Sequence, residues 1–393
     1  MPSRRPRVTV ATRIYAPEAA AAAFRLEHLA RALAEHADVD VLTTRAPGAD
    51  AHEPPAGVRV RRWPVLRDRS GYVRGYLPYL SFDVPLLVRL LAGARPDVVV
   101  AEPPPTTGAV VRLVCALRRV PYVWYAADVW SDAVASTGSP RVVVRLLRAL
   151  ESWVVRGAAG SVAVSDGVAE RVRALGGREV VVVGNGVDTD VFGPQGPQRG
   201  DRRTLVYAGT ASEWQGADVF ARAMHQVLER VPDARLVYLG QGSALAEIRR
   251  VADGLPAGAV RVLGQVSPQE SAAWMRGAAA AVVSIVPGQG YDFAVPTKVF
   301  AALGVGTPVL YAGVGPVVDL LAGADVPLGS AVSHDVEAVA EGMLSLLRDA
   351  RGGGRGKERQ ARAAWVLDHR SLGAVAARAA GVIVGVARSR SRP

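Results

Sequence analysis

A lysine at the start of a predicted helix is the residue of this chain best suited to bind a phosphate group. Pro296 and Thr297 are predicted to open the helix, so that its free amides and its dipole favour an anion in the preceding loop. Lys298 lies in the first turn, where its charge opposes the dipole unless an anion binds there. Only Lys298 and Lys357 are lysines among 47 basic residues, so an arginine-rich composition does not explain this lysine. The pattern predicts a diphosphate site, and a solvent-facing lysine is the alternative.

Three glycine-containing turns in the second half of the chain follow predicted strands. The strands are expected at 205–208, 235–239 and 260–263, and open parallel sheets bind ligands beyond the carboxyl ends of their strands. One glycine after a strand is often only a turn, but three at intervals of about one strand–helix unit indicate a ligand site. The predicted site comprises Gly209, Thr210, Gly240, Gly242, Gln265 and Val266.

The elements that must position these residues alternate between short β-branched runs and amphipathic segments, which is typical of parallel βαβ units. Helices are expected at 24–36 and 141–156, and the segment 193–203, rich in Gly, Pro and charge, is the clearest linker. We predict an α/β protein of two Rossmann-like domains: 1–192, a linker at 193–203, 204–370, and a last helix at 371–393. Further strands are expected at 7–12, 39–43, 58–62, 98–101, 122–125, 161–164, 180–183, 281–285 and 308–311.

A nicotinamide or flavin enzyme is the first alternative for such a fold. Its fingerprint needs glycines at the first strand-to-helix turn, because backbone amides must approach the pyrophosphate closely. Here the first strand is followed by Ile14-Tyr15-Ala16-Pro17-Glu18 and five alanines, and no glycine precedes Gly48. The sequence therefore argues against a dinucleotide in the first domain.

Composition narrows the function classes further. The net charge of +11 is spread over both halves rather than clustered, which disfavours a nucleic-acid partner. Cys115 is the single cysteine, which excludes a disulfide within the chain. The six histidines show no metal-ligand spacing, and we expect no secretory signal at the start of the chain. The apolar stretch 374–387 is interrupted by Arg378 and is short for a membrane span. We expect a cytoplasmic protein without a metal or other cofactor.

With these features the chain resembles glycosyltransferase family 4, the retaining enzymes of the GT-B fold, in the branch with a Pro-x-Lys helix start. The resemblance rests on Pro296-Thr297-Lys298 and, in the same order as in the family, on Asp128-Val129-Trp130, Glu151-Ser152-Trp153 and Asn185-Gly186-Val187-Asp188 with Phe192. It implies that the two domains face each other across a cleft that holds the active site, and that the last helix crosses back to the first domain. It also implies transfer of a sugar from a nucleoside-diphosphate sugar to an acceptor hydroxyl, with retention and without a metal.

The resemblance assigns the donor site to the second domain, with some departures from the family. Gln215 stands where a lysine is expected, and Phe293 and Ala301 stand where two carboxylates are expected. Lys298 would then stabilise the leaving diphosphate with the amides of Gly209, Thr210 and the helix start. Asp292 is the only carboxylate of the loop and is a candidate to bind sugar hydroxyls. The remaining donor-loop candidates are Ala294, Val295, Pro296 and Thr297.

The acceptor side is assigned to the first domain. By resemblance Asp128 orients the acceptor hydroxyl or accepts its proton, and a helix cap is the equally weighted alternative, with Asp132 as its local competitor. The other acceptor candidates are Glu18, Arg25, Glu102 and Trp130.

The acceptor itself and the rival functions stay open. The aromatic segment 71–82, unusual for a loop, is core packing or a surface for an acceptor or membrane. With Arg141, Arg145 and Arg148 it allows peripheral membrane contact and a lipid-linked acceptor, and a soluble natural-product scaffold is the competing expectation. The rival functions are a nucleotide-sugar epimerase or cyclitol-coupling enzyme, and an inactive partner of another transferase.

Overall fold

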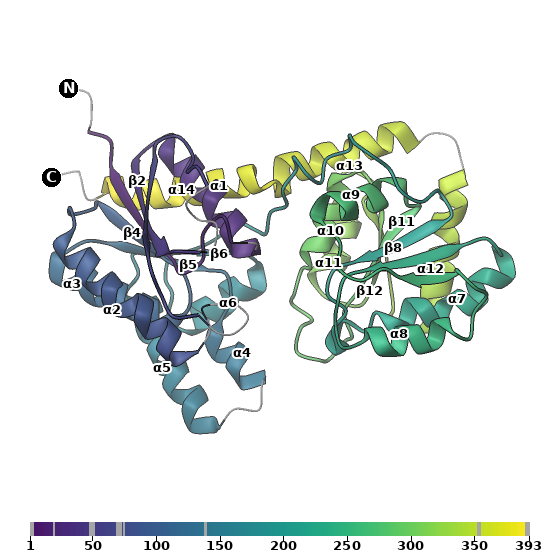
Figure 1. The fold of residues 1–393 in the computed structure, drawn as a ribbon, viewed down its shortest axis with the longest axis horizontal. Coiled ribbons are helices and arrows are strands. Elements are labelled where there is room, and N and C mark those ends of the chain that lie inside the picture. Colours follow the sequence, from purple (N-terminus) through teal and green to yellow (C-terminus); the bar gives the residue numbers. More distant parts are fainter. Residues whose placement is uncertain are drawn as a thin grey trace. The chain divides into compact units, whose positions relative to one another are not determined.

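The computed structural model describes residues 4–18, 20–46, 52–67, 73, 75–136, 140–351 and 355–389. The chain forms two compact units, one of Met1–Asn185 with Leu372–Pro393 and one of Gly186–Ser371. Each unit is a parallel sheet covered by helices (Figure 1).

The first unit contains a seven-stranded sheet in the order β3-β2-β1-β4-β5-β6-β7. All neighbouring strands run parallel, and the order reverses between β1 and β4, which is where such sheets bind ligands. The strands are β1 (Arg7–Ala11), β2 (Asp38–Thr44), β3 (Val58–Trp63), β4 (Val98–Ala101), β5 (Tyr122–Ala126), β6 (Gly160–Ala163) and β7 (Val180–Val182).

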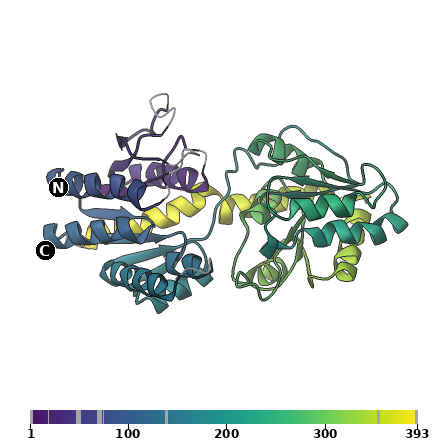
Figure 2. The same cartoon turned by 60° about the horizontal axis from the view of Figure 1, so that its bottom comes forward.

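Seven helices surround this sheet or one another in the described part of the unit, and the last one comes from the end of the chain. Residues such as Val375, Ala379 and Ile383 of this helix, α14, lie in the core of the first unit beside α1, as Figure 2 also shows. By length and composition α14 could cross a membrane, but its inner face is buried here. The helices are α1 (Ala21–Ala34), α2 (Tyr76–Ala92), α3 (Pro105–Arg118), α4 (Trp130–Ser136), α5 (Arg141–Gly157), α6 (Asp166–Ala174) and α14 (Leu372–Ser389).

The second unit contains a six-stranded parallel sheet in the order β10-β9-β8-β11-β12-β13. Its order reverses between β8 and β11, so the carboxyl ends of these two strands mark its ligand-binding edge. The strands are β8 (Thr204–Ala208), β9 (Arg235–Leu239), β10 (Val260–Val262), β11 (Ala280–Ser284), β12 (Val309–Ala312) and β13 (Gly329–Val332).

Two hydrophobic clusters form the core of the second unit. One is built with α7, α8 and α12, and the other with α9, α10 and α11 and with Val366 of α13. The elements are the short 3-10 helix η2 (Glu213–Gln215) and the helices α7 (Asp218–Arg230), α8 (Leu245–Ala252), α9 (Pro268–Gly277), α10 (Thr297–Gly304), α11 (Pro316–Gly323), α12 (Val336–Arg351) and α13 (Arg355–Arg370).

The expectation of two Rossmann-like parallel sheets is confirmed, but three details differ. Strand β13 was not predicted, because it is only four residues long and lies at the sheet edge. The segment 71–82 is not a loop: from Tyr76 on it belongs to α2, in which Pro78 and Pro85 obscure the helical pattern and Phe82 is fully buried. Residues 71, 72 and 74 of that segment lie outside the described residues.

The boundary between the units also lies earlier than predicted. It falls after Asn185 rather than after residue 192. The amide of Val187 donates to the Arg370 carbonyl at 2.8 Å. Val187 also belongs to a core cluster of the second unit. Phe192 packs against the same cluster. Side-chain packing, rather than composition, therefore assigns 186–203 to the second unit.

Candidate active site

The predicted phosphate-binding lysine lies at the ligand-binding edge of the second sheet. Helix α10 begins at Thr297 after Pro296, and Lys298 extends from its first turn toward the end of β8. Its Nζ donates to the Tyr207 hydroxyl at 2.7 Å and to the Thr210 carbonyl at 3.1 Å. The same Nζ lies 4.0 Å from the centre of the Tyr207 ring, and the Tyr207 hydroxyl donates to the Thr210 carbonyl at 2.7 Å.

The environment of Lys298 is uncharged. Burial lowers the pKa of Lys298 to about 7, because removal from water disfavours the ammonium form. In the part of the chain that the structure describes, no carboxylate lies within ion-pair distance of Nζ. A lysine held beside a helix N-terminus without a protein anion is suited to bind an anionic ligand.

The predicted glycine turns pack on one another at this edge. A Cβ atom on Gly240 would lie 2.1 Å from the Gly209 carbonyl oxygen, and one on Gly242 would lie 2.2 Å from the Ala211 carbonyl oxygen. The φ angle of Gly240 is +140°. Glycine at 240 and 242 is therefore required by the close approach of neighbouring loops.

One expectation about these turns is corrected by the backbone bonding. The Gly209 amide donates to the Leu239 carbonyl at 2.7 Å, so it is not free for a phosphate as expected. Thr210 is exposed, as is Gln265, and Val266 packs at the edge of the core. The charge for a diphosphate is thus left mainly to Lys298 and the start of α10.

Two of the proposed donor residues face the protein interior. The Gln215 side-chain oxygen accepts from the Ser212 amide at 3.0 Å, and Gln215 is buried. Ala301 is buried in the core against which α10 packs. We correct the expectation for both: Gln215 caps its own turn and Ala301 contacts the core, because each side chain points inward from its element.

The loop before α10 is held by its own contacts. Asp292 accepts from the Gly288 amide at 3.0 Å, so this carboxylate closes a turn in addition to being a candidate ligand for sugar hydroxyls. Tyr291 stacks on Trp214 with ring centroids 4.3 Å apart. This pair was missed in the sequence, since its members are 77 positions apart by number and no pattern connects them. Phe293, Ala294, Val295 and Pro296 are half-buried, and Thr297 is exposed.

The corresponding edge of the first sheet carries a buried ion pair. Arg25 of α1 forms a salt bridge to Glu102, which follows β4, and Thr12 donates to the same carboxylate at 3.1 Å. Burial raises the pKa of Glu102, while Arg25 opposes this effect. Both residues were expected to contact the acceptor, but each is occupied by the other in the interior, so we correct that expectation to a role in holding this edge.

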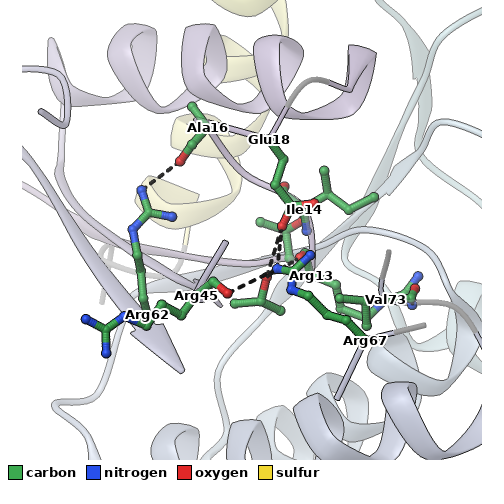
Figure 3. A network of polar contacts seen from close by, with 10 residues as sticks. Arg13, Ile14, Ala16, Glu18, Arg45, Arg62, Arg67 and Val73 are labelled. Carbon is green, nitrogen blue, oxygen red and sulfur yellow. Dashed lines mark hydrogen bonds and ion pairs between the residues drawn. The ribbon is translucent and has the colours of Figure 1, made fainter. Parts of the chain in front are cut away.

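Glu18 is likewise held by neighbouring chain segments. It accepts from Arg67 at 2.8 Å and from Thr44 at 3.2 Å. Figure 3 shows these groups around the loop that follows β1, with Arg62 bonded to the Ala16 carbonyl at 2.7 Å. Glu18 therefore joins this loop to β2, and Ala21–Ala23 already belong to α1.

Asp128 is the carboxylate of this edge that remains available. The amides of Trp130 and Ser131 at the start of α4 donate to Glu151, each at 2.9 Å, so Asp128 is not the cap of that helix. Asp132 is paired with Arg148 at 2.9 Å and with Arg171. Asp128 is exposed, and among the described residues its carboxylate has no hydrogen bond or ion pair. Desolvation by the surrounding chain raises its pKa, and Arg25 counteracts this.

Three further polar or aromatic side chains of the first unit were missed. The Arg13 guanidinium, directly after β1, lies 4.0 Å from the centre of the Tyr79 ring, and Tyr79 in turn packs edge-on against Trp130 at 5.9 Å. Asp83 is buried and accepts from Thr107 at 2.6 Å. Tyr79 and Asp83 escaped notice because they lie on α2, which was not predicted.

No group of three or more His, Cys, Asp or Glu side chains within the described ranges could hold a metal ion. The sheet edge of the second unit carries a half-buried lysine at a helix start beside crowded glycine turns, and the sheet edge of the first unit carries an exposed carboxylate.

Comparison with known proteins defines the class. Residues 21–186 match the family model of the glycosyl transferase 4-like domain, and residues 202–349 match that of the glycosyl transferases group 1. No curated protein matches the sequence. Together with the two Rossmann-like sheets, these matches define a GT-B glycosyltransferase. The first part of the chain is thus similar to a glycosyl transferase 4-like domain and the second part to a glycosyl transferases group 1 domain.

Solved structures share the fold at low identity. HepE from Anabaena in complex with UDP and glucose has 15% identity, covers 96% of this chain and 99% of its own, and has a TM-score of 0.63. WaaG, a glycosyltransferase involved in lipopolysaccharide biosynthesis, has 16% identity, coverages of 96% and 100%, and a TM-score of 0.64. A candidate UDP-N-acetylglucosamine 2-epimerase from Listeria monocytogenes has 15% identity, coverages of 99% and 98%, and a TM-score of 0.61. These similarities show the fold, which transferases share with that candidate epimerase.

Proposed function

We propose that the protein is a metal-independent, retaining glycosyltransferase that takes its sugar from a nucleoside diphosphate. The observation that carries the proposal is Lys298, a half-buried lysine that has no anionic partner among the described residues and lies at the ligand-binding edge of the second sheet. The two glycosyltransferase domain matches and the UDP complexes of HepE support the same donor class.

In this proposal Lys298 and the amides at the start of α10 stabilise the diphosphate. Negative charge increases on the diphosphate as the anomeric carbon becomes cation-like, and preorganised positive groups lower the energy of that state. Since Gln215 points inward where a second cation was expected, Lys298 is the only lysine or arginine that we assign to this task. Asp128 of the first unit is the proposed group that orients the acceptor hydroxyl or accepts its proton.

The acceptor in this proposal is a hydroxyl of a natural-product scaffold or of a lipid-linked glycan, and the reaction takes place in the cytoplasm. We propose no cofactor, and the donor sugar and base are to be found by experiment.

The test is calorimetric titration of UDP-, GDP-, TDP- and ADP-sugars into the wild type, Lys298→Ala and Lys357→Ala. Lys357 is the other lysine of the chain and is exposed on α13, so its variant is the matched control. We expect one donor to bind the wild type and the control, with a loss of about ten- to hundredfold in Lys298→Ala, the size expected for a charge-assisted contact. If no donor binds at millimolar concentration, the protein is instead an inactive partner of another transferase.

Epimerisation is the second candidate, because the candidate epimerase from Listeria monocytogenes shares the fold over nearly the whole chain. The two activities differ in their products. A transferase forms a new glycosidic bond only when an acceptor is present, whereas an epimerase converts the nucleotide sugar without one. Nuclear magnetic resonance of the donor incubated with enzyme alone, and then with candidate acceptors, separates them.

A further inference from the structure

Helix α2 is apolar on both its inner and its outer face. Phe82, Leu86 and Leu90 face the core of the first unit. The opposite side, at spacings of three and four residues, carries exposed Leu77, Leu80, Val84, Val88 and Leu91. A helix that is hydrophobic all round normally has both faces covered, but within the described residues nothing covers the outer face of α2.

The exposed apolar surface continues over two neighbouring helices. Helix α3 contacts both α2 and α5, and the three helices lie side by side in the first unit (Figure 1). The exposed fractions of the large apolar residues on the three helices run from 38% to 69%, and those on α3 and α5 are Leu113, Leu117, Val142, Val143, Leu146 and Trp153. Patches of this kind are uncommon on monomeric proteins and mark contact surfaces.

The charged residues of these three helices that are not buried in the interior are all positive. Their two acidic residues, Asp83 and Glu151, are buried, and every other charged residue is an arginine: Arg89, Arg112, Arg118, Arg141, Arg145, Arg148 and Arg156. Arg112 lies 4.3 Å from the centre of the Trp153 ring, which joins α3 to α5 at the surface. Arg141 and Arg145 are exposed and form no ion pair with a described residue.

We propose that the outer faces of α2, α3 and α5 bind the surface of a membrane that contains anionic lipids. Apolar side chains between arginines suit the boundary of acyl chains and headgroups, where the chains bury apolar groups and the phosphates attract guanidinium groups. A second copy of this chain fits less well, because two such faces would bring arginines together without exposed carboxylates. The proposal does not rest on the donor chemistry, since these residues lie in the first unit and Lys298 lies in the second.

Co-sedimentation of the full chain with vesicles tests the proposal. The vesicles contain phosphatidylcholine alone or phosphatidylcholine with about one third phosphatidylglycerol. Each type is tested at low and at high salt, because salt screens the attraction between arginines and lipid phosphates. The variants are Leu80→Ser/Val84→Ser/Val88→Ser on α2 and Arg141→Glu/Arg145→Glu on α5. The matched controls are Leu367→Ser and Arg249→Glu/Arg261→Glu, which change exposed residues of the second unit.

We expect the wild type to bind the anionic vesicles, with weaker binding at high salt, and each α2 or α5 variant to bind at least about tenfold more weakly. The controls should stay within about twofold, since they lie off the proposed surface. Circular dichroism confirms that the variants are folded. The proposal is overturned if the wild type binds both vesicle types equally, if the controls lose as much affinity, or if the wild type forms dimers that the α2 variant abolishes and binds no vesicles. Donor titration in the same variants should be unchanged, so a failure here and a failure of the donor site are distinguishable.

Discussion

The amide of Trp130 donates a hydrogen bond of 2.9 Å to the Glu151 carboxylate, and this contact shows that Asp128 does not cap the helix that follows it. Glu151 is buried on α5 and also accepts from the Ser131 amide, so it caps the start of α4. Asp128 lies two residues before Trp130, one position outside the N-cap of α4, where aspartate side chains often bond helix amides. Because Glu151 already meets that task, the Asp128 carboxylate is not needed to cap α4.

The first prediction compares these two acids. We expect Asp128→Asn to lower the rate of sugar transfer about a hundredfold, the usual effect of losing a general base, without change in donor affinity or melting temperature. Glu151→Gln should instead lower the free energy of unfolding by about 1 kcal/mol. Steady-state kinetics and thermal melts of both variants check this. A loss of stability in Asp128→Asn with unchanged transfer would show that it has a structural role.

The second prediction concerns the pH dependence of donor binding. A diphosphate favours the protonated form of Lys298, whose pKa is lowered to about 7 in the free protein. As the pH rises above 7 the free protein loses this proton, and binding must restore it. Donor affinity should therefore fall by up to about tenfold per pH unit between pH 7 and 9. Calorimetry at several pH values measures this, and Lys298→Ala should bind weakly with no such trend. A constant wild-type affinity over this range would contradict the assignment.

The third prediction follows from the same pKa by linkage. In the unfolded chain Lys298 keeps its usual pKa near 10.5, so between about pH 7 and pH 10.5 the unfolded state binds more protons than the folded state. Stability should therefore rise with pH through this window. Lys298→Met removes the effect and should be more stable than the wild type by roughly 2 kcal/mol below pH 7, with the difference closing toward pH 10.

Chemical denaturation at pH 6.5 and pH 9.5 tests that prediction. Lys357→Met, at an exposed position, is the control and should match the wild type at both values. If Lys298→Met is less stable than the wild type at the lower pH, burial of the Lys298 ammonium group does not destabilise the folded protein.

The fourth prediction uses two glycines with positive φ angles. Gly240→Ala would place a Cβ 2.1 Å from the Gly209 carbonyl oxygen, whereas no atom lies within 4 Å of a Cβ on Gly264. We expect Gly240→Ala to lower the free energy of unfolding by roughly 2–3 kcal/mol and to weaken donor binding, because it displaces the turn that accepts from Lys298. Gly264→Ala should lower it by only about 1 kcal/mol. Melting curves and donor titration compare the two, and equal effects would show that backbone conformation alone matters.

The local sequence pattern predicts most of the strands and the position of the proposed phosphate-binding lysine. The β-branched runs predict the strands up to β12 to within a residue or two, and Pro296-Thr297 predicts the start of α10. These features depend on neighbours within a few positions, such as the fixed φ of proline and the alternation of strands with amphipathic helices. Lys298 was found for the same reason, since a lysine in the first helical turn opposes the local dipole.

The tertiary structure decided which of the candidate groups are free. Nothing near Glu102 in the sequence shows that Arg25 occupies it, and nothing near Asp128 shows that Glu151 caps the helix beside it. Nor does the sequence show that the Gln215 side chain points inward to Ser212. The apolar outer face of α2 is recognised only from the exposed fractions of its side chains in the folded chain. The availability of a side chain depends on partners brought together by folding from distant parts of the chain, and a local pattern carries no record of them.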